Sequence, residues 1–544
     1  MAVATTHSPI DSPSWLRRWR VPLSAVALPI FMYTLLFVWF RFDLEPAAQM
    51  PLFMAFQASV MLGLLILVVW WLFFSGFRWL TKLVVLALAV ALPIGFAQTV
   101  RRADFTGSMM PRFYFIWQDD PAGGLDRQLA AAQAASTDGL PAIDLTIGPT
   151  DFPRYRGPNV DGVVQPAALA LDWATQPMKV LWKQPCGGGY AGFAVAGNVA
   201  VTIEQRRDEE VIVCYDRATG KERWKYAYPA LFEQTAMMGG NGPRATPTIV
   251  EDQVFSLGAT GYLVCLYGDT GQLHWRVNIL GDNGAKNLYW GMTGSPLVVG
   301  PNVIVNAGVD PENNVGKAVV AYDRGTGAKV WAAGNTAGGY SSPQLVKLAG
   351  VEVILLFDAG GLVALDPATG KEEWRHEWKT FSDMNIVQPL ALSGNRVFIS
   401  SDAGNGGVML HVDRNRNGWV IAKLWENRNM YVRFANPIAH RGHLYGLCNG
   451  FLTCVEDQTG KRLWKDGRFG SGQLLLVGDA LLILSESGEV VTVAADPSGY
   501  RELGRLEVLT GKTWNTPALA GRQLFVRNHY EMACLELAGA DAQK

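Results

Sequence analysis

The sequence predicts an eight-bladed β-propeller preceded by three transmembrane helices. Three observations predict it: a turn-and-tryptophan motif recurs along the chain, 58 glycines and 19 tryptophans accompany it, and the apolar residues of the first hundred positions form three long runs. Many glycines permit many tight turns, and many tryptophans in a turn-rich chain indicate a repeated packing device. A chain of 544 residues is too long for one ordinary core unless its fold is a repeat or a large barrel.

Each of the three apolar runs is long enough to cross a bilayer as a helix. They cover residues 21–40, 51–74 and 83–100, and a helix of about 20 residues spans about 30 Å of hydrocarbon. The first run is too long for the apolar part of a secretory signal peptide, and no A-x-A cleavage pattern follows it. The second contains LLILVVWWLFF, which leaves no polar face for a soluble core helix.

Flanking charges predict the orientation of these helices. Basic residues lie before the first run and between the second and third, namely Arg17, Arg18, Arg20, Arg78 and Lys82. The positive-inside rule therefore places the tail, residues 1–20, in the cytoplasm and the large domain outside it. Arg101 and Arg102 favour the opposite orientation, but a long following domain is translocated largely regardless of such charges. The sequence thus predicts a multi-pass protein of the cytoplasmic (inner) membrane with its propeller in the periplasm.

Residues 101–150 are predicted to be a linker between the helices and the propeller, which takes residues 151–544. Within this linker the aromatic stretch MPRFYFIW, residues 110–117, is expected to lie at the membrane interface or against the domain. Residues 128–136 could make a short helix between segments rich in Gly, Pro and Thr.

The recurring motif is a turn followed by a tryptophan. Tyr215-Asp-Arg-Ala-Thr-Gly-Lys-Glu-Arg-Trp224 and Leu365-Asp-Pro-Ala-Thr-Gly-Lys-Glu-Glu-Trp374 are nearly the same, and related copies end at Trp275, Trp331 and Trp464. Looser copies end at Trp425 and near Leu506, where the tryptophan is lost. The Asp is expected to bond the turn backbone, the Gly to take the left-handed conformation, and the Trp to wedge between neighbouring sheets.

A second motif precedes most of these turns and sets the number of blades. Copies such as ATPTIV, GSPLVV, SSPQLV, QPLAL, NPIAH and TPALA mark first strands, and units of four short strands open near positions 193, 245, 294, 341, 388, 436, 472 and 516. The last unit has no anchor tryptophan, whereas Val180-Leu181-Trp182 precedes the first unit without one of its own. Pairing that N-terminal strand into the last blade closes the ring at eight blades and protects the strand edges.

These repeats resemble the pyrroloquinoline-quinone (PQQ)-type propeller family, whose members share an A-x-T-G-x-x-x-W anchor. The resemblance covers residues 151–538 and implies a quinoprotein-like eight-bladed fold. It leaves the function open, because the family includes quinoprotein dehydrogenases and also the non-catalytic propeller lipoprotein of the outer-membrane barrel-assembly machine. The segment Phe152-Pro-Arg-Tyr-Arg-Gly-Pro-Asn159 is similar to one found in many bacterial propellers of this type.

A PQQ-dependent dehydrogenase with calcium, passing electrons to membrane quinone, is the enzymatic alternative that the resemblance implies. The anchor tryptophans from Trp182 to Trp464 are only 39 to 56 residues apart. Blades this short leave few insertions to wall and cover a large planar cofactor. No calcium ligand set with a catalytic Asp can be carried over residue by residue, so no catalytic or metal residue is predicted and no cofactor is firmly predicted.

Three local patterns are better explained by structure than by chemistry. The run Asp413-Arg-Asn-Arg-Asn-Gly418 matches the first half of a calcium loop but has Leu424 where the loop needs Glu, so a divergent turn is favoured. His440 and His443 span a turn, and two ligands do not make a metal site. Four cysteines share one strand position in four units and are expected to be small buried residues without bridges: Cys214, Cys265, Cys454 and Cys534.

The predicted ligand surface is the mouth of the central channel, at the residues that lead into each inner strand. By repeat position these are Arg244, Tyr340, Asn385, Arg433, Asn436, Trp514 and Asn515. Their polarity and aromaticity suit recognition of a small molecule or peptide. The simpler alternative is that they hydrogen-bond the first strands of neighbouring blades around a wet axis.

Charge excludes one class of function. Lys and Arg total 47 against 48 Asp and Glu, so neither a net field nor a clustered basic face attracts nucleic acid. The sequence therefore favours a membrane-anchored periplasmic propeller that acts as a non-catalytic binding or scaffold module for a protein or envelope component. The alternatives are the PQQ-dependent dehydrogenase and a barrel-assembly-like scaffold, which would need a lipid tether in place of the three helices.

Overall fold

The computed structural model describes most of the chain as two compact units, Met1–Arg101 and Arg102–Lys544. The described residues are 23, 25–35, 49–107, 110–118, 124–125, 139–164, 169–171, 173, 177–235, 239–310, 312–313, 315–380, 384–402 and 405–539. The predicted tail of residues 1–20 and the predicted short helix of residues 128–136 lie outside them.

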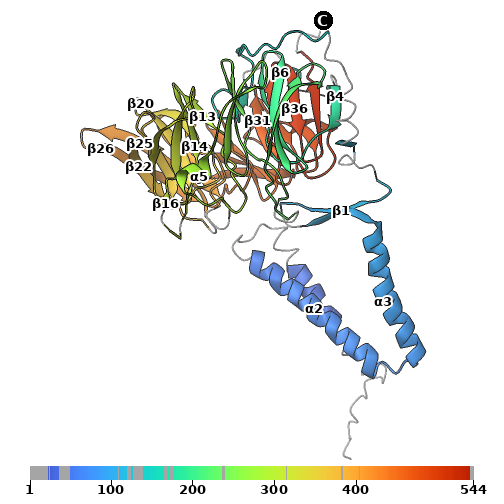
Figure 1. Ribbon diagram of the computed structural model, residues 1–544. Helices are drawn as coiled ribbons and strands as arrows, with labels where there is room; N and C mark the ends of the chain where they lie inside the picture. Colours follow the sequence, from blue (N-terminus) through green and yellow to red (C-terminus); the bar gives the residue numbers. More distant parts are fainter. Residues whose placement is uncertain are drawn as a thin grey trace, which may run out of the picture. The chain divides into compact units, whose positions relative to one another are not determined.

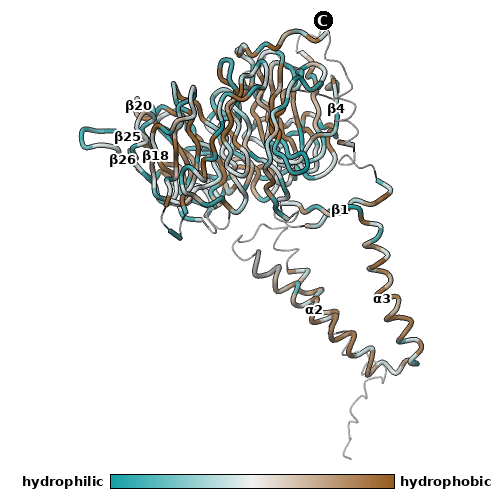
Figure 2. The backbone as a smooth tube through the Cα atoms, viewed as in Figure 1, coloured by the Kyte–Doolittle hydropathy of each residue, from teal (hydrophilic) through white to brown (hydrophobic). Residues whose placement is uncertain are grey.

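The first unit is helical and strongly apolar. Helix α2 (Gln49–Phe74) and helix α3 (Trp79–Thr99) each include a stretch that is long and apolar enough to cross a membrane, as their brown colour in Figure 2 indicates. A third apolar helix, Ala25–Leu35, is shorter than a membrane span. The predicted count of three transmembrane helices is therefore not confirmed, because the ends of the first run fall outside the described residues.

The second unit is a β-propeller whose eight blades surround a central axis (Figure 1). First strands contact first strands of neighbouring blades, so they line the axis. They are β5 (Ala194–Ala196), β9 (Thr248–Val250), β13 (Leu297–Val299), β19 (Gln344–Leu348), β23 (Leu390–Leu392), β27 (Ile438–His440), β31 (Gln473–Val477) and β35 (Ala518–Ala520). The second strands are β6 (Val199–Arg206), β10 (Gln253–Leu257), β14 (Asn302–Asn306), β20 (Val351–Asp358), β24 (Arg396–Ser401), β28 (His443–Cys448), β32 (Ala480–Leu484) and β36 (Gln523–Arg527).

The third and fourth strands complete each blade towards the outside. The third strands are β7 (Glu209–Asp216), β11 (Tyr262–Tyr267), β17 (Val319–Asp323), β21 (Gly361–Leu365), β25 (Gly406–Asn415), β29 (Phe451–Glu456), β33 (Glu489–Ala494) and β37 (Glu531–Glu536). The outer strands are β8 (Glu222–Pro229), β12 (Leu273–Asn278), β18 (Lys329–Ala333), β22 (Glu372–Glu377), β26 (Gly418–Asn427), β30 (Arg462–Arg468), β34 (Glu502–Glu507) and, in the eighth blade, β4 (Lys179–Pro185). Blades are numbered 1 to 8 from β5.

Blade 8 confirms the predicted closure of the ring. Strand β4, which precedes all of blade 1, pairs antiparallel with β37, and Trp182 lies opposite Cys534. The same pairing of an anchor Trp with a third-strand residue occurs at Cys214, Cys265 and Cys454, so the four cysteines hold one repeat position. All six cysteines of the chain are buried and free.

The anchor motif works as its sequence predicts. In blade 1, Asp216 Oδ1 accepts hydrogen bonds from the backbone N–H and the hydroxyl of Thr219 at 2.9 and 2.7 Å. Gly220 has φ +71°, and a Cβ there would lie 2.7 Å from the ring of Trp182 in blade 8. The Trp182 indole in turn donates to the carbonyl of Arg217 at 3.2 Å. Each anchor tryptophan of this kind therefore joins one blade to the turn of the next.

The second motif forms a belt of hydrogen bonds around the axis. In blades 2 to 6, the side chain of the residue before the motif proline accepts a bond from the backbone N–H of the equivalent residue one blade earlier. The bonds run from Gly192 to Thr246 (3.0 Å), Thr246 to Ser295 (3.0 Å), Ser295 to Ser342 (2.9 Å), Ser342 to Gln388 (3.2 Å) and Gln388 to Asn436 (2.6 Å). Small polar residues recur at this position because the belt needs an acceptor there.

Blade 7, which lacks an anchor tryptophan, takes one from a distant segment. At the position of the missing Trp the chain has Gly504, opposite Thr492. A Cβ at Gly504 would lie 2.9 Å from Trp173, whose side chain is buried there. The hydroxyl of Thr492 donates to the carbonyl of Leu171 at 3.0 Å, which holds this segment in place. The segment before β4 thus supplies the packing that the repeat has lost.

Further short elements decorate the blades. Strands β15 (Val309–Asp310) and β16 (Val315–Gly316) form a small hairpin beside helix α5 (Ile279–Asn283), and β3 (Val163–Val164) pairs parallel to β31. Strands β1 (Val100–Phe105) and β2 (Pro111–Phe115) form a separate two-stranded sheet. The longest strands are β25 and β26, ten residues each, and their hairpin projects from blade 5 (Figure 1).

Candidate functional site

Three of the predicted channel residues use their amides to join parts of the propeller. Asn385 donates to the carbonyls of Asp358 at 2.6 Å and Trp378 at 3.2 Å. Asn515 donates to the carbonyls of Ala191 at 2.9 Å and Gly189 at 3.2 Å. These contacts match the simpler alternative, in which polar residues of the mouth hold neighbouring blades together.

Asn436 links the belt to the segment that crosses the channel. Its Oδ1 accepts from the backbone of Gln388, and its Nδ2 donates to the hydroxyl of Tyr155 at 2.7 Å. Two residues before Tyr155, the carbonyl of Pro153 accepts from the backbone N–H of Ile249 in blade 2 at 2.8 Å. Blades 2 and 6 are opposite each other in an eight-membered ring, so residues 152–156 bridge the channel. The fully buried Arg156 fixes this bridge, donating to the carbonyl of Asp161 at 2.6 Å.

Arg244 and Trp514 come together in a group of aromatic and basic side chains that we call the mouth cluster: Tyr190, Arg244, Lys512, Trp514 and His529. The ring of Tyr190 lies 5.4 Å from Trp514 and 5.9 Å from His529, centroid to centroid. The Lys512 ammonium is 4.5 Å from the Trp514 ring, and the Arg244 guanidinium is 5.5 Å from that of Tyr190. Cation–π contacts of this kind hold the cluster in one arrangement.

The charged members of the mouth cluster repel one another and are poorly solvated. Burial lowers the pKa of Lys512 to about 8, although Asp104 and Glu486 favour its charge. Burial likewise lowers the pKa of Arg244 to about 10. Burial, then the charge of Lys512, lowers the pKa of His529 to about 3, so the imidazole is neutral at physiological pH. Its Nδ1 accepts from the backbone N–H of Gly189 at 3.1 Å.

The donors of the mouth cluster bond to the protein itself. Arg244 donates to the carbonyls of Gly240 and Gly242, and Lys512 to that of Gly239. The hydroxyl of Tyr190 also donates to the Gly239 carbonyl. The Trp514 indole donates to Glu486 Oε1 at 2.8 Å. Arg244, Lys512 and Trp514 have the charge and ring that a planar anion such as PQQ would need, but each already donates a hydrogen bond within the chain, and the Trp514 ring packs against Tyr190 and Lys512.

The two other predicted residues lie nearby on the same side of the channel. Arg433 pairs with Asp402 and donates from Nη1 to the carbonyl of Gly107 at 2.8 Å. Tyr340 is buried, packs edge-on against Trp290 at 5.4 Å, and accepts at its carbonyl from Thr293 at 2.7 Å. Neither joins the mouth cluster.

Sequence reasoning missed Tyr190, Lys512, His529 and the nearby Glu486. Tyr190 precedes the first strand of blade 1 at the repeat position of Arg244. Lys512 lies two residues before Trp514, which has that position in blade 8. His529 and Glu486 lie in turns between second and third strands, and no repeated letter marks that position. Among the described residues, no three His, Cys, Asp or Glu side chains gather as metal ligands would.

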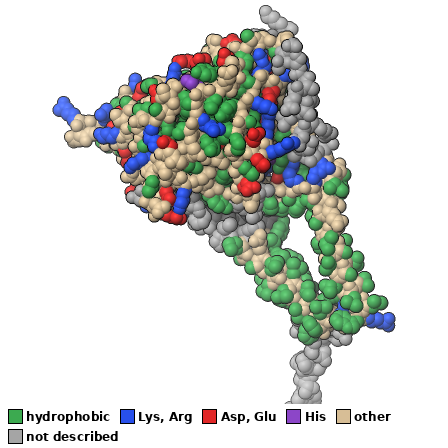
Figure 3. Space-filling model, viewed as in Figure 1, with side chains coloured by type: hydrophobic (Ala, Val, Ile, Leu, Met, Phe, Trp, Pro, Cys, Tyr) green, Lys and Arg blue, Asp and Glu red, His purple; other side chains and the backbone are tan. Residues whose placement is uncertain are grey.

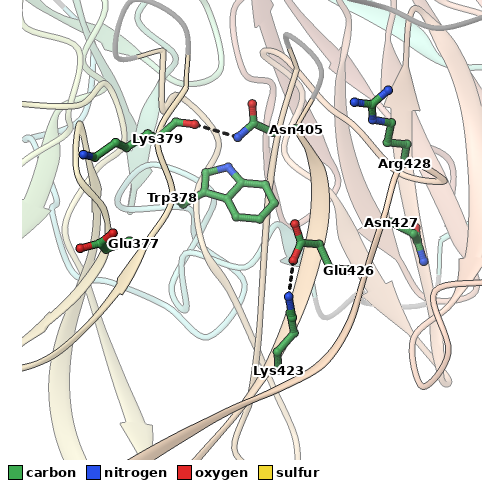
Figure 4. A pocket seen from close by; sticks show the side chains of 8 residues that line it. All are labelled: Glu377, Trp378, Lys379, Asn405, Lys423, Glu426, Asn427 and Arg428. Carbon is green, nitrogen blue, oxygen red and sulfur yellow. Dashed lines mark hydrogen bonds and ion pairs between the residues drawn. The ribbon is translucent and has the colours of Figure 1, made fainter.

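An open depression of about 700 Å³ lies on the outside of the propeller between blades 4 and 5 (Figure 4). It is lined by Glu377, Trp378, Lys379, Asn405, Lys423, Glu426, Asn427 and Arg428. Asn405 donates to the Lys379 carbonyl at 2.8 Å, and Lys423 pairs with Glu426 at 2.7 Å. The Trp378 indole donates to Ser401 at 2.8 Å, which fixes the floor. Charges of both signs around an aromatic floor suit a peptide or protein surface.

We call the hairpin of β25 and β26 the blade 5 arm. The last residues of β26 line the depression, and the turn that forms the tip of the arm precedes the first residue of β26. Its tip is the predicted divergent turn, closed by the pairing of Asn415 with Gly418, and its basic side chains are visible in Figure 3. Near the tip the Arg414 guanidinium lies 5.3 Å from the ring of Trp419. The Trp419 indole donates to Glu373 of blade 4 at 2.8 Å. The arm is therefore braced, and its exposed end is polar (Figure 2).

A buried carboxyl at the joint of blades 1 and 2 gives the fold a pH dependence. Glu210 accepts from the Tyr228 hydroxyl at 2.7 Å and from the Ala259 N–H at 2.8 Å, and burial raises its pKa to about 7. Since the pKa in the folded state is above the ordinary value of 4.5 for Glu, the associated stability is complete below about pH 4.5 and is lost as the pH rises through 7. In the wild type, the free energy of unfolding should fall by up to about 3 kcal/mol between pH 4.5 and a pH above 7 because of this group. We expect this fall to be absent in Glu210→Gln.

Urea unfolding of the purified chain at pH 5 and pH 8 measures this effect. The exposed neighbour variant Glu209→Gln is the control and should keep the wild-type pH dependence. An unchanged difference between the two pH values in Glu210→Gln contradicts the assignment.

Comparisons with known proteins agree with this architecture. A family model described as outer membrane protein assembly factor BamB matches residues 232–466. BamB of Burkholderia pseudomallei (strain K96243) is 22% identical over 310 residues, which cover 54% of this chain and 74% of that protein. The structure of quinohemoprotein alcohol dehydrogenase from Comamonas testosteroni has a TM-score of 0.51 and 14% identity, covering 78% of this chain and 85% of that one.

A second solved structure, BamB from Moraxella catarrhalis, is 14% identical with a TM-score of 0.46, covering 66% of this chain and 97% of that one. At such identities a structural likeness defines the fold alone. The class is that of the eight-bladed propellers with anchor-tryptophan repeats. The matching family model and the Burkholderia relative support a PQQ-type β-propeller repeat family.

Proposed function

We propose that this chain is a bacterial envelope protein, anchored in the cytoplasmic membrane by its N-terminal helices, whose periplasmic propeller binds a protein partner without catalysing a reaction. The observation that carries the proposal is the state of the channel mouth. Arg244, Lys512 and Trp514 bond to the chain itself, and residues 152–156 bridge the channel. A ligand in the channel would have to displace these bonds, whereas the outer surface is accessible.

The blade 5 arm and the depression beside it are the proposed contact surface. The arm presents the exposed side chains of Arg414, Arg416 and Val420 on a braced hairpin. Rigid presentation reduces the conformational entropy lost on binding. The exposed outer edge of β26 can also accept a strand from a partner. The Burkholderia relative is named as an assembly factor, which supports a protein partner over a small molecule.

The predicted orientation is supported by an account of Arg102, one of the two basic residues that oppose it. Arg102 follows the last apolar helix, where a basic residue favours a cytoplasmic location. Its guanidinium lies 3.7 Å from the ring of Tyr530 and pairs with Asp104 at 3.5 Å. The propeller fold therefore gives Arg102 a structural reason. Arg101 still opposes the orientation, and the basic residues before the first run and between the second and third favour a cytoplasmic N-terminus.

In-cell photo-cross-linking tests the proposal. A benzophenone amino acid replaces Arg416 or Val420 in the arm, with Gln458, an exposed turn residue of blade 6, as the matched control. The proposal predicts that one envelope protein is captured from both arm positions and not from Gln458. Equal capture from all three positions, or none from the arm, contradicts it.

The alternative of a PQQ-dependent dehydrogenase is favoured by one observation, the combination of Arg244, Lys512 and Trp514 at the channel mouth. Two cations beside an indole would suit a planar polycarboxylate if their present hydrogen bonds opened. The barrel-assembly-like scaffold has the weaker support, because apolar helices replace the lipid tether that such a scaffold uses.

A further inference from the structure

The hairpin of β1 and β2 has two different faces. On the inner face, the Arg102 guanidinium lies between the rings of Tyr114 and Tyr530, at 4.2 and 3.7 Å from their centroids. Asp104, only 3% exposed, pairs with Arg102 and accepts from the Tyr530 hydroxyl at 3.3 Å. This face is therefore packed against blade 8.

Gly107, which follows β1, is bonded at the channel mouth. The backbone N–H of Gly107 donates to Glu486 Oε1 at 2.5 Å, and its carbonyl accepts from Arg433 at 2.8 Å. A Cβ at Gly107 would lie 1.9 Å from the Ser471 hydroxyl, so the backbone approaches blade 7 as closely as only glycine permits. Contacts to blades 6, 7 and 8 hold the hairpin in one position.

The outer face is apolar and exposed. Met110 is 57% exposed and Trp117 is 68% exposed, and Phe113 and Ile116 also show much of their surface. The Trp117 ring stacks on Phe115 at 4.8 Å with the planes 2° apart, so the two rings form a flat plate. A contiguous apolar patch of this kind usually contacts a membrane or a partner.

Continuity of the chain decides between these occupants. Helix α3 ends at Thr99 and β1 begins at Val100, so Arg102 is three residues beyond an apolar membrane-length helix. Three extended residues reach at most about 10 Å, and the headgroup layer is about 5–8 Å thick on each side of the hydrocarbon, so the hairpin begins in this layer or directly beside it. Tryptophan and other aromatic side chains are enriched at that depth, because their rings are amphipathic.

We propose that the outer face of this hairpin lies in the lipid headgroup layer and ties the channel mouth to the membrane surface. The inference rests on the proposed membrane anchoring. The side chains that enter the headgroup layer are those of Trp117, Phe115 and Met110. On the opposite side of the hairpin, the contacts with the propeller are made by Arg102 and Gly107. The aromatic stretch of the expected linker, residues 110–117, then contacts the membrane interface with one face and the propeller domain with the other.

Quenching by spin-labelled lipid tests this in the full chain. The variants Trp117→Cys and Met110→Cys are each labelled with the fluorophore NBD and reconstituted in phosphatidylethanolamine–phosphatidylglycerol nanodiscs. The six native cysteines are buried, which limits background labelling. Lipid with a nitroxide near the headgroup should reduce the emission from both positions about two-fold. The control Gln458→Cys, on an exposed anchor turn, should remain unquenched.

A label at Leu88→Cys in α3 separates this inference from the anchoring proposal. If Leu88 is quenched by a nitroxide deep in the acyl chain while positions 110 and 117 match Gln458, the helix is inserted and the hairpin proposal is wrong. If Leu88 is also unquenched, membrane anchoring itself fails, and the hairpin proposal fails with it.

Discussion

Replacing Arg527 with alanine is expected to lower the free energy of unfolding by about 3–5 kcal/mol. The guanidinium is fully buried at the joint between blades 8 and 1, where it donates to Thr202 Oγ1 at 2.8 Å and to the carbonyls of Gly187 and Ile203. It also lies 3.9 Å from the carboxylate of Glu204, itself buried. Removing it leaves two carbonyls without donors and one buried charge with a single counter-ion.

Urea unfolding of the purified chain measures this loss. Arg522→Ala removes an exposed arginine directly before the same strand, β36, and its salt bridge with Glu536 is 3.9 Å long, so a loss below about 1 kcal/mol is expected. Arg527→Lys keeps the charge without the planar fork and should be intermediate. A loss in Arg527→Ala no larger than in Arg522→Ala contradicts the role of this network in closing the ring.

Gly271→Ala is expected to destabilise the propeller by about 3–4 kcal/mol, because two costs coincide. The residue has φ +70°, which costs an L-residue about 1–2 kcal/mol. A Cβ would also lie 2.6 Å from the ring of Trp224 in the preceding blade, and overpacking of this kind costs about 1–3 kcal/mol.

Gly350→Ala separates the two costs. Gly350 has φ +80° but nothing within 4 Å of the position of its Cβ, so only the backbone cost applies. Thermal unfolding of both variants should show the larger fall in Gly271→Ala. Equal decreases in the melting temperature would mean that the anchor glycine is needed only for the backbone conformation of the turn and not for the packing of the neighbouring blade's tryptophan.

The fold could be predicted from the sequence because the contacts between its blades are made by residue types that recur at fixed repeat positions. The anchor residues Asp, Thr, Gly and Trp specify the blades and join each to the next. The residue before the proline joins the first strands around the axis. The extra strand around Trp182 specifies how the ring closes. The turn between β28 and β29 is an Asn-Gly pair, Asn449-Gly450, whose φ values of +51° and +80° are those that this pair favours in a tight hairpin.

The remaining features are made by single residues that no repeat marks. Trp173 replaces a lost anchor from a segment without the motif, and its partner Gly504 gives no signal in sequence. In the candidate site the repeat position placed Arg244 and Trp514 at the mouth, but it could not distinguish them from Asn385 or Asn515, which bond to backbone carbonyls. His529 and Glu486 join the mouth only through the packing of blades 7 and 8.

Titration of the purified full-length chain with PQQ and Ca²⁺ tests most directly whether the propeller is a binding module with a closed channel mouth. Absorbance follows uptake of the cofactor, and dye reduction with alcohols and sugars follows turnover. The account predicts neither saturable uptake nor turnover. Uptake of one cofactor per chain with turnover, abolished in Arg244→Ala and Lys512→Ala, would contradict it and establish the dehydrogenase.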